Sequence, residues 1–434
     1  MRQHRPPAPV GSSQPNLQSD EAPLRVEFWF LLALTGIATG LVGGLLMRLL
    51  WATQHLAFHY ASGELVAGAS QVSSFRRVMV LLAAGLLAGG AGLLASRFRG
   101  DTDLGGAVWT RSGRLPVVKA SIRALYSIVV VGMGAAVGRE NALKQAGGIV
   151  ANLASAWRRL PDEQRRLLVA CGGGAGMAAA YNVPLGGALF TLEILLGSFS
   201  LRAVLPAFAA SFLATWASWL LLPNQPTYQL SYSSHPISSV MWIALIGPVC
   251  GLFAVPLVRL FAWAKSAKPK GWQVAAMPVL ALAVLGVIAI EVPAMLGNGK
   301  DVVQITFTTG MGTLWIVVLL LRPLITATIL RSGVPGGLFT PTMAFGAVAG
   351  LLFGRAWSAV AHMPIGGEQH LFAFLGAGAV LAAATQGPAS SLAFMLELTG
   401  VDQTLVVPLL LAIVSATLTM RFFETRSIYS VEVT

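Results

Sequence analysis

Charged residues are scarce in this chain. Only 11% of its 434 residues are Asp, Glu, Lys or Arg, whereas 55% are hydrophobic, and the mean hydropathy is +0.72. Ordinary soluble domains carry about 25% charged residues, so the composition excludes that class. The chain is therefore expected to lie in a membrane.

Cysteine is rarer still. Cys171 and Cys250 are the only two, and each lies in apolar sequence with no Cys or His at ligand spacing. Both are interpreted as packing residues, since buried free cysteines behave as small apolar side chains. No disulfide framework, metal site or cofactor is expected.

Long apolar runs predict a helical membrane fold. A crossing needs about 20 residues of helix, and single strands would leave backbone groups unsatisfied in lipid. Other runs, such as Ile128–Val137 and Ala207–Leu222, are short or interrupted, which is typical of helices that stop part-way and line a substrate path. The clearest spans are Phe28–Leu50, Val78–Ala95, Met241–Ala264, Val274–Ile290 and Leu405–Met420.

The excess of basic residues predicts an orientation. Lys and Arg outnumber Asp and Glu by 29 to 17, giving a net charge of +12. Because many of them lie in short connections between apolar runs, the positive-inside rule places those connections in the cytoplasm, and nucleic acid is not the expected partner. The segment 223–236 has no Lys or Arg and is predicted to be external. The basic connections contain Arg158, Arg159, Arg165, Arg166, Lys265, Lys268 and Lys270.

The N-terminal residues 1–24 are rich in Pro, Ser and Gln. They are predicted to form a disordered cytoplasmic tail. They do not read as a cleavable signal peptide, because no short apolar region with a small-residue cleavage site precedes the first full-length span.

The chain repeats itself. Residues 172–193 align with residues 376–397 at a spacing of 204, with ten identities that include Pro184/Pro388, Phe190/Phe394 and Glu193/Glu397. We therefore expect a first membrane repeat over 25–220, an external connection over 221–239, a second repeat over 240–425 and a C-terminal segment, 426–434, that carries Tyr429.

Two glycine-rich loops occupy corresponding places in the repeats. At a spacing of 199, Gly138 of "VGRENALKQAGG" is set against Gly337 of "GGLFTPTMAFGA". Each loop leads into a helical stretch, and a helix N-terminus attracts anions through its unpaired N–H groups. Because broken helices from paired repeats meet near the bilayer midplane, an anion pathway is expected there.

Glu140 is the notable residue of the first loop. An ionised carboxylate could occupy the N–H cradle, block an anion path, and leave when protonated. Burial favours its protonated form and the N–H donors favour its ionised form, and the sequence does not decide between them. The alternative is a buried ion pair of Glu140 with Arg139 or with Lys144, one helical turn on.

Four motifs carry a resemblance to a known family. "GREN" at 138–141 resembles the GREGP motif, and "GGLFTP" at 336–341 the GxFxP motif, of the CLC chloride channels and chloride/proton exchangers. The Ala/Gly-rich segment 168–197 and "RSIYS" at 426–430 are similar to further motifs of that family. These matches fall in the family's order over residues 28–430.

The resemblance implies an all-α polytopic membrane protein with two inverted-topology repeats, whose broken helices meet at a central anion site. It also implies a homodimer with one pathway per subunit, which binds chloride or another small anion, protons and membrane lipid. Glu140 would be the gating and proton-transfer glutamate, and Tyr429 would offer its hydroxyl to the anion together with the N–H groups of Leu338 and Phe339. Gly138, Arg139, Asn141 and Thr340 are the remaining candidates for anion binding.

This chain departs from the family pattern at three places. The family's Ser-containing GSGIP motif has no secure match within 97–111, where Thr102 is the candidate replacement. Ala142 follows "GREN" in place of Gly-Pro, and Lys144 is an unusual neighbour of the gate. Ile194 stands where exchangers commonly carry an inner proton-accepting acid, one residue after Glu193.

We predict an exchanger of chloride, or of a similar small anion, for protons. The alternative is a passive anion channel without proton coupling, because Ile194 replaces the inner carboxylate. The predicted proton pathway includes Glu140, Glu193 and the position of Ile194. A compact chain that ends too soon for cytoplasmic nucleotide-binding domains is similar to prokaryotic members, so a prokaryotic inner membrane and a cytoplasmic N-terminus are expected.

Two other classes are disfavoured. An intramembrane enzyme is not indicated, because His55 and His59 have the spacing of a metal pair but "HLAFH" lacks the acidic neighbour of a zinc-protease helix. A purely structural membrane protein would not need glycine-rich loops in both halves. Glu397, the repeat partner of Glu193, is expected to support helix packing or capping.

Overall fold

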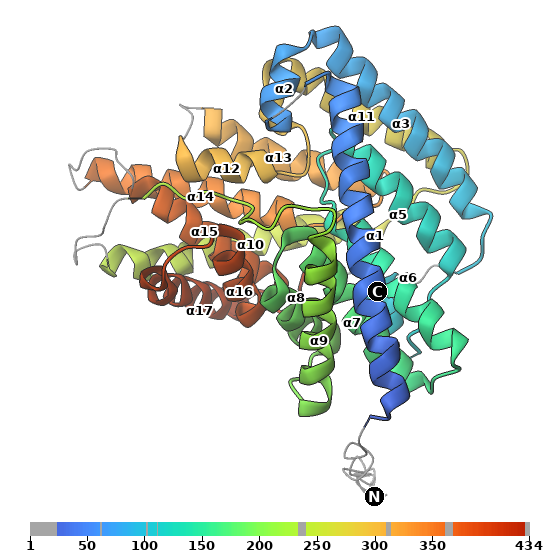
Figure 1. The fold of residues 1–434 in the computed structure, drawn as a ribbon. Helices are drawn as coiled ribbons and strands as arrows, with labels where there is room; N and C mark the ends of the chain where they lie inside the picture. The colour runs from blue at the N-terminus through green and yellow to red at the C-terminus, as the bar shows by residue number, and fades with distance from the viewer. Residues whose placement is uncertain are drawn as a thin grey trace, which may run out of the picture.

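The described chain is almost entirely helical (Figure 1). The computed structural model describes residues 24–60, 63–100, 103–110, 112–232, 240–309, 314–360 and 368–429. Residues 1–23 of the predicted tail and residues 233–239 of the predicted external connection lie outside these ranges. Within them the β pairing consists of one isolated bridge, between Gly138 and Gly337.

The helices fall into the two predicted halves. In the first half they are α1 (Val26–Phe58), α2 (Leu65–Gln71), α3 (Ser74–Ser96), α4 (Leu104–Trp109), α5 (Val117–Gly132), α6 (Glu140–Trp157), α7 (Asp162–Tyr181), α8 (Pro184–Phe190) and α9 (Leu201–Ser218). In the second half they are α10 (Val240–Ser266), α11 (Gln273–Glu291), α12 (Lys300–Thr308), α13 (Leu314–Arg331), α14 (Phe339–Val360), α15 (Glu368–Thr385), α16 (Pro388–Thr399) and α17 (Val406–Phe423).

The predicted membrane spans are confirmed. Eight helices in the described residues are long and apolar enough to cross a bilayer, and the five clearest predicted spans coincide with α1, α3, α10, α11 and α17, the last of them starting one residue before α17. The predicted break in Ile128–Val137 is also confirmed, because α5 ends at Gly132 and α6 begins only at Glu140.

The predicted interruption of Ala207–Leu222 is wrong. Helix α9 runs continuously from Leu201 to Ser218 and is one of the eight candidate spans. Its polar residues do not break it: the Ser218 hydroxyl donates to the Thr215 carbonyl of the same helix, 2.7 Å away. A hydroxyl satisfied by its own helix carries no cost that would end the span.

Corresponding helices of the two halves pack alike. Helices α6 and α7 approach so closely that a Cβ on Gly147 would overlap the Gly172 carbonyl oxygen. In the second half, a Cβ on Gly346 of α14 would likewise overlap the Gly376 carbonyl oxygen of α15. Across the halves, α3 and α11 lie side by side (Figure 1). These matching contacts agree with the two repeats read from the sequence.

Two glutamates cap helices of the opposite half. The Glu397 carboxylate accepts from the N–H groups of Leu185 and Gly186 at the start of α8, at 3.0 and 2.7 Å. The Glu193 carboxylate accepts from Ala389 and Ser390 at the start of α16, at 3.1 and 2.7 Å. The capping expected for Glu397 is confirmed, and its repeat partner does the same.

We expect Glu193→Ala and Glu397→Ala each to remove about 1–2 kcal/mol of folding stability, because each leaves two helix N–H groups without their acceptor. In detergent, this corresponds to a fall of about 1–4 °C in melting temperature. Glu163→Ala is the matched control, because that side chain is 63% exposed and forms a salt bridge with Arg202 at the surface. Equal melting temperatures for all three variants would contradict the capping role.

Candidate functional site

The two glycine-rich loops meet through their backbones. Gly138 N–H donates to the Gly337 carbonyl at 2.8 Å, and Gly337 N–H donates to the Gly138 carbonyl at 2.7 Å. The loops lie 199 residues apart in the chain, so this reciprocal pair joins the two halves at the point that the repeat alignment predicted. It fixes the start of α6 beside the start of α14.

Glu140 is fully buried at this junction. One carboxylate oxygen accepts from the backbone N–H of Phe339, the first residue of α14, at 2.6 Å. The other lies 3.3 Å from the Tyr181 hydroxyl and 3.5 Å from the Thr340 hydroxyl, and those two hydroxyls are 2.7 Å apart. The carboxylate therefore occupies the place of an anion at a helix N-terminus, where backbone N–H groups and the helix dipole favour negative charge.

The structure does not contain the alternative, a salt bridge of Glu140 with Arg139 or with Lys144. The Arg139 guanidinium lies over the Tyr181 ring, 4.7 Å from its centroid, and the Lys144 ammonium lies over the Tyr429 ring at 4.8 Å. In the described residues neither cation forms a salt bridge with Glu140. Glu140 is thus held by backbone and hydroxyl donors.

Tyr429 is brought to this junction by the C-terminal segment. The Ile428 N–H donates to the Ala384 carbonyl of α15 at 2.9 Å, and Tyr429 itself is only 4% exposed. Its ring packs edge-on against Phe190, with centroids 5.5 Å apart. Phe190 contacts Phe394, which packs against Phe339 at 4.6 Å, so aromatic contacts run from Tyr429 to the residue whose N–H holds Glu140.

A basic cavity of about 1230 Å³ opens on one side of the junction. Asn141 and Gln145 of α6 lie in its wall, together with Gly336 of the second loop. Seven Lys and Arg side chains line it against one acidic residue, Asp103, so it concentrates anions near the site. The seven are Lys119, Arg123, Arg259, Lys265, Lys268, Lys270 and Arg426.

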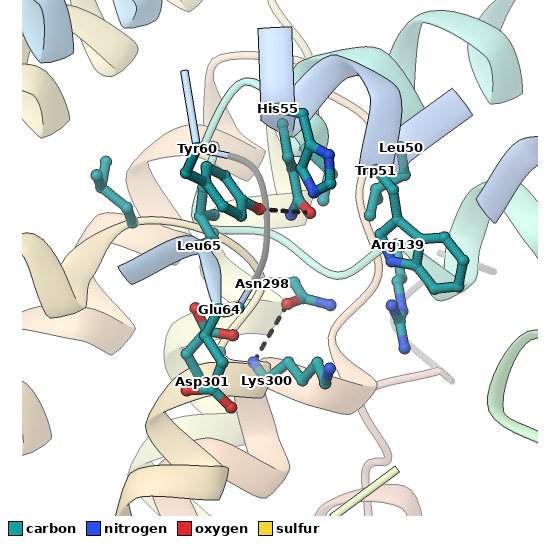
Figure 2. Close-up of a pocket in the computed structure, with 16 residues that line it drawn as sticks. Leu50, Trp51, His55, Tyr60, Glu64, Leu65, Arg139, Asn298, Lys300 and Asp301 are labelled. Carbon is teal, nitrogen blue, oxygen red and sulfur yellow. Dashed lines mark hydrogen bonds between the residues drawn. The ribbon is translucent and has the colours of Figure 1, made fainter. Parts of the chain in front are cut away.

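A second, mixed-charge cavity of about 280 Å³ lies on the other side (Figure 2). Figure 2 shows Glu64 and Asp301 along one wall, with Lys300 beside them and Arg139 facing them across the cavity. Asp301 accepts from the Val66 N–H at 2.7 Å, and burial raises its pKa. Burial and the nearby Asp301 carboxylate raise the pKa of Glu64 to about 7, against an opposing effect of Lys300.

Glu140 therefore lies between two cavities. Its chain neighbour Arg139 lines the mixed-charge cavity, and its other neighbour, Asn141, lines the basic cavity. The predicted anion-binding set is brought to this one junction: Gly138 in the bridge, Arg139 and Asn141 beside the cavities, and Leu338, Phe339 and Thr340 at the start of α14. Whether these residues bind an anion stays a prediction.

The divergent stretch before α4 is described only in part. Thr102, the candidate replacement for the missing Ser, lies outside the described residues. Asp103 follows it as the N-cap of α4, and its carboxylate accepts from the Gly106 N–H at 2.9 Å. The Asp103 carboxylate therefore caps the first turn of α4.

The inner part of the predicted proton pathway consists of Glu193 and the apolar Ile194. Ile194 is 8% exposed within the π-helical turn Thr191–Leu196 that follows α8. The Glu193 carboxylate beside it is bound to the two N–H groups at the start of α16. A role for either position in proton movement stays a prediction.

Sequence reasoning missed Tyr181 and the mixed-charge cavity. Tyr181 ends an Ala/Gly-rich helix, and its hydroxyl was the one polar group in "GMAAAYNVP" before Asn182 that could have signalled a contact. The mixed-charge cavity combines the end of α1, the start of α2 and the start of α12, which share no motif.

Comparison of the sequence with known proteins gives one family. A family model described as voltage gated chloride channel matches residues 85–421. The voltage-gated ClC-type chloride channel ClcB of Citrobacter koseri is 32% identical over 390 residues, which cover 85% of this chain and 89% of that protein. ClcB of Shigella flexneri is 34% identical over 388 residues with the same coverage.

Comparison of the structure with solved structures identifies the fold. A slow cyanobacterial Cl⁻/H⁺ antiporter superposes with a TM-score of 0.81 at 20% identity, covering 94% of this chain and 97% of that one. A CLC-type fluoride/proton antiporter gives a TM-score of 0.67 at 18% identity, covering 93% and 97%. These likenesses confirm the predicted all-α polytopic fold.

Proposed function

The chain belongs to the family of voltage-gated chloride channels, the CLC family, and we propose that it exchanges chloride, or a similar small anion, for protons. It is an integral membrane protein related to chloride channels and antiporters. The observation that carries the proposal is the Glu140 carboxylate, fully buried, bound by the Phe339 N–H and set between two cavities.

Competition between carboxylate and anion is the first step of the proposed mechanism. An anion drawn into the basic cavity approaches the junction past Asn141 and Gln145. It competes with the Glu140 carboxylate for the N–H of Phe339, because both are negatively charged acceptors. While the ionised carboxylate holds that donor, the path between the cavities stays closed.

Protonation is the second step. A protonated Glu140 loses the charge-assisted part of its hydrogen bonds, which are roughly twice as strong when one partner is ionised. The side chain can then leave the Phe339 N–H and turn towards the mixed-charge cavity beside Arg139, so an anion takes its place. Its return delivers the proton to the other side, which couples the two movements.

A passive channel is the second candidate, and Ile194 favours it. That side chain is apolar and 8% exposed, and Glu193 is engaged as a helix cap, so no inner carboxylate stands ready to receive the proton. In a channel, Glu140 would still open and close the anion path without a fixed ratio of protons to anions.

We also propose a homodimer in a prokaryotic inner membrane, with the N-terminus in the cytoplasm. The start of α1 lies on the side of the basic connections, since Glu27 approaches Arg158 at 3.8 Å. By the positive-inside rule that side is cytoplasmic. Exposed aromatic and aliphatic side chains on α9 and α17, including Phe212, Trp216 and Leu418, offer a face for a second subunit or for lipid.

The test is a flux experiment on the purified protein in liposomes. We expect an imposed chloride gradient to drive protons uphill, recorded with a chloride electrode and a pH electrode together. Chloride movement without proton movement would favour the channel. Absence of movement for chloride and for other small anions would overturn the proposed function.

Glu64 is expected to add a pH dependence of its own. Its pKa is about 7, so its carboxyl is neutral below that pH and ionised above it. The ionised form adds negative charge to the cavity that Arg139, Lys300, Asp301 and His55 also line, so it repels anions. Transport should therefore fall by roughly two- to fivefold as the pH on that side rises through 7. In Glu64→Gln this component should disappear while that of Glu140 stays. An unchanged pH profile would contradict the role of Glu64.

A further inference from the structure

Lys144 is a buried cation whose electrostatic attraction to the buried Glu140 carboxylate, one helical turn earlier, falls short of a salt bridge. It is 3% exposed, and its ammonium lies 4.8 Å from the centroid of the Tyr429 ring. In the part of the chain that the structure describes, no carboxylate forms a salt bridge with it. Buried charges in membrane proteins are costly and are ordinarily paired, so this one calls for a counter-charge.

The position of Lys144 points to the anion pathway. It follows Glu140 by four residues on α6, which puts the two side chains on one face of the helix. Its neighbour Gln145 and the preceding Asn141 line the basic cavity. Lys144 thus belongs to the same stretch of α6 as Glu140, which closes the junction, and as two residues that line the cavity from which an anion arrives.

The nearby start of α4 does not supply the same charge. Asp103 caps that helix and takes the Gly106 N–H at 2.9 Å, so a carboxylate of the chain itself faces the first turn. The carboxylate lowers the positive potential that the helix end would otherwise offer to an anion. Lys144 is a positive charge near the junction, contributed by α6.

We propose that Lys144 is a direct ligand of the transported anion, which binds beside its ammonium and becomes its counter-charge when the Glu140 carboxylate leaves. The inference rests on the proposed function, because the ligand is the small monovalent anion of the same pathway. The Tyr429 ring holds the ammonium in place while the site is empty, and the arriving anion completes the ion pair. Such a site binds its anion more tightly than one built from hydroxyl and N–H donors alone, and releases it more slowly.

The experiment compares Lys144→Met with Lys144→Arg in the full-length protein. Methionine keeps the length and flexibility of the side chain without its charge, and arginine keeps the charge. Chloride is titrated calorimetrically into each purified protein in a chloride-free buffer with a large organic anion. We expect Lys144→Met to weaken chloride binding at least about tenfold, and Lys144→Arg to stay within about threefold of the wild type.

A melting experiment separates this role from a purely structural one. Without chloride, Lys144→Met should melt no lower than the wild type, because a buried charge that forms no salt bridge has been removed. With chloride, the wild type should gain stability and Lys144→Met should gain far less. A structural lysine predicts the opposite: a lower melting temperature without chloride and an unchanged chloride affinity, and that result would overturn the inference.

The outcome also distinguishes this inference from the proposed function. If the wild type binds bromide, nitrate or fluoride but not chloride, and Lys144→Met loses that binding, the choice of chloride fails and the role of Lys144 stands. If chloride binds equally to all three proteins, the role of Lys144 fails and the exchanger remains. If none of these anions binds to the wild type, both are overturned.

Discussion

Proton movement is expected to stop in Glu140→Gln, while chloride movement continues. The amide has nearly the shape of the carboxylic acid but cannot carry a proton between the cavities. It also has no negative charge, so its bond to the Phe339 N–H is a neutral one, worth about 0.5–1.5 kcal/mol instead of about 1.5–3. The side chain should therefore yield the site to chloride at every pH.

The measurement is simultaneous chloride and proton flux in liposomes from pH 4.5 to 7.5. We expect uphill proton flux to fall at least about 100-fold, because no other titratable group takes the place of Glu140. Chloride flux should lose the part of its rise at low pH that depends on Glu140, keep the smaller part that depends on Glu64, and stay near the high value of the wild type. In Glu140→Ala, which removes the carboxylate entirely, the same loss of pH dependence is expected with a wider path.

Glu193→Gln is the matched control for Glu140→Gln. It makes the same chemical change on a glutamate that caps α16, so it should keep the proton-to-chloride ratio of the wild type. Proton-coupled transport that survives in Glu140→Gln would remove Glu140 from the mechanism. Loss of coupling in Glu193→Gln would instead assign it to the proton pathway.

The junction of the two loops could be predicted because it repeats. The spacing of 199 residues set Gly138 against Gly337, and the structure joins these two glycines by two backbone hydrogen bonds. The same reasoning placed both loops at helix starts, since glycine followed by a helical stretch marks an N-terminus, whereas Phe339 was a candidate only through the family resemblance. Glycine-rich loops and helix starts can be recognised in short stretches of sequence, so a single sequence was enough to predict this part of the backbone geometry.

The partners of Glu140 were harder to predict. Tyr181 and Thr340 lie 41 and 200 residues away from it, and their hydroxyls meet at the carboxylate through the packing of α7 and α14. Whether Glu140 forms an ion pair or accepts from a helix N-terminus depends on the directions of the side chains. In the structure, the Arg139 and Lys144 side chains both lie over tyrosine rings. Contacts of this kind depend on helix positions in three dimensions, which residue spacing does not give.

Gly138→Ala is expected to open the path without removing the gate residue. A methyl group built on Gly138 would overlap the Glu140 carboxylate, and the overlap is with the far end of a flexible side chain. The backbone bonds between Gly138 and Gly337 do not involve a side chain, so they remain. The carboxylate should therefore leave the Phe339 N–H and the fold should stay intact.

The expected result is a several-fold increase in chloride flux at pH 7.5, with a weaker rise on acidification, because the ionised carboxylate no longer competes for the site. Losing one charged hydrogen bond of about 1.5–3 kcal/mol corresponds to roughly a 10- to 150-fold change in occupancy of the cradle. Gly90→Ala is the control, since a methyl group there meets nothing within 4 Å. It should leave flux unchanged, and its melting temperature should be equal to or slightly higher than that of the wild type, because alanine is favoured over glycine inside a helix.

The double variant Gly138→Ala with Glu140→Ala decides whether the effect acts through the carboxylate. If the methyl group acts by displacing Glu140, it has nothing to displace once that side chain is gone, and the double variant should match Glu140→Ala alone. The two single effects would then be strongly non-additive, as expected for groups in direct contact. Additive effects would mean that the alanine alters the loop itself, and the carboxylate would not be the barrier between the two cavities.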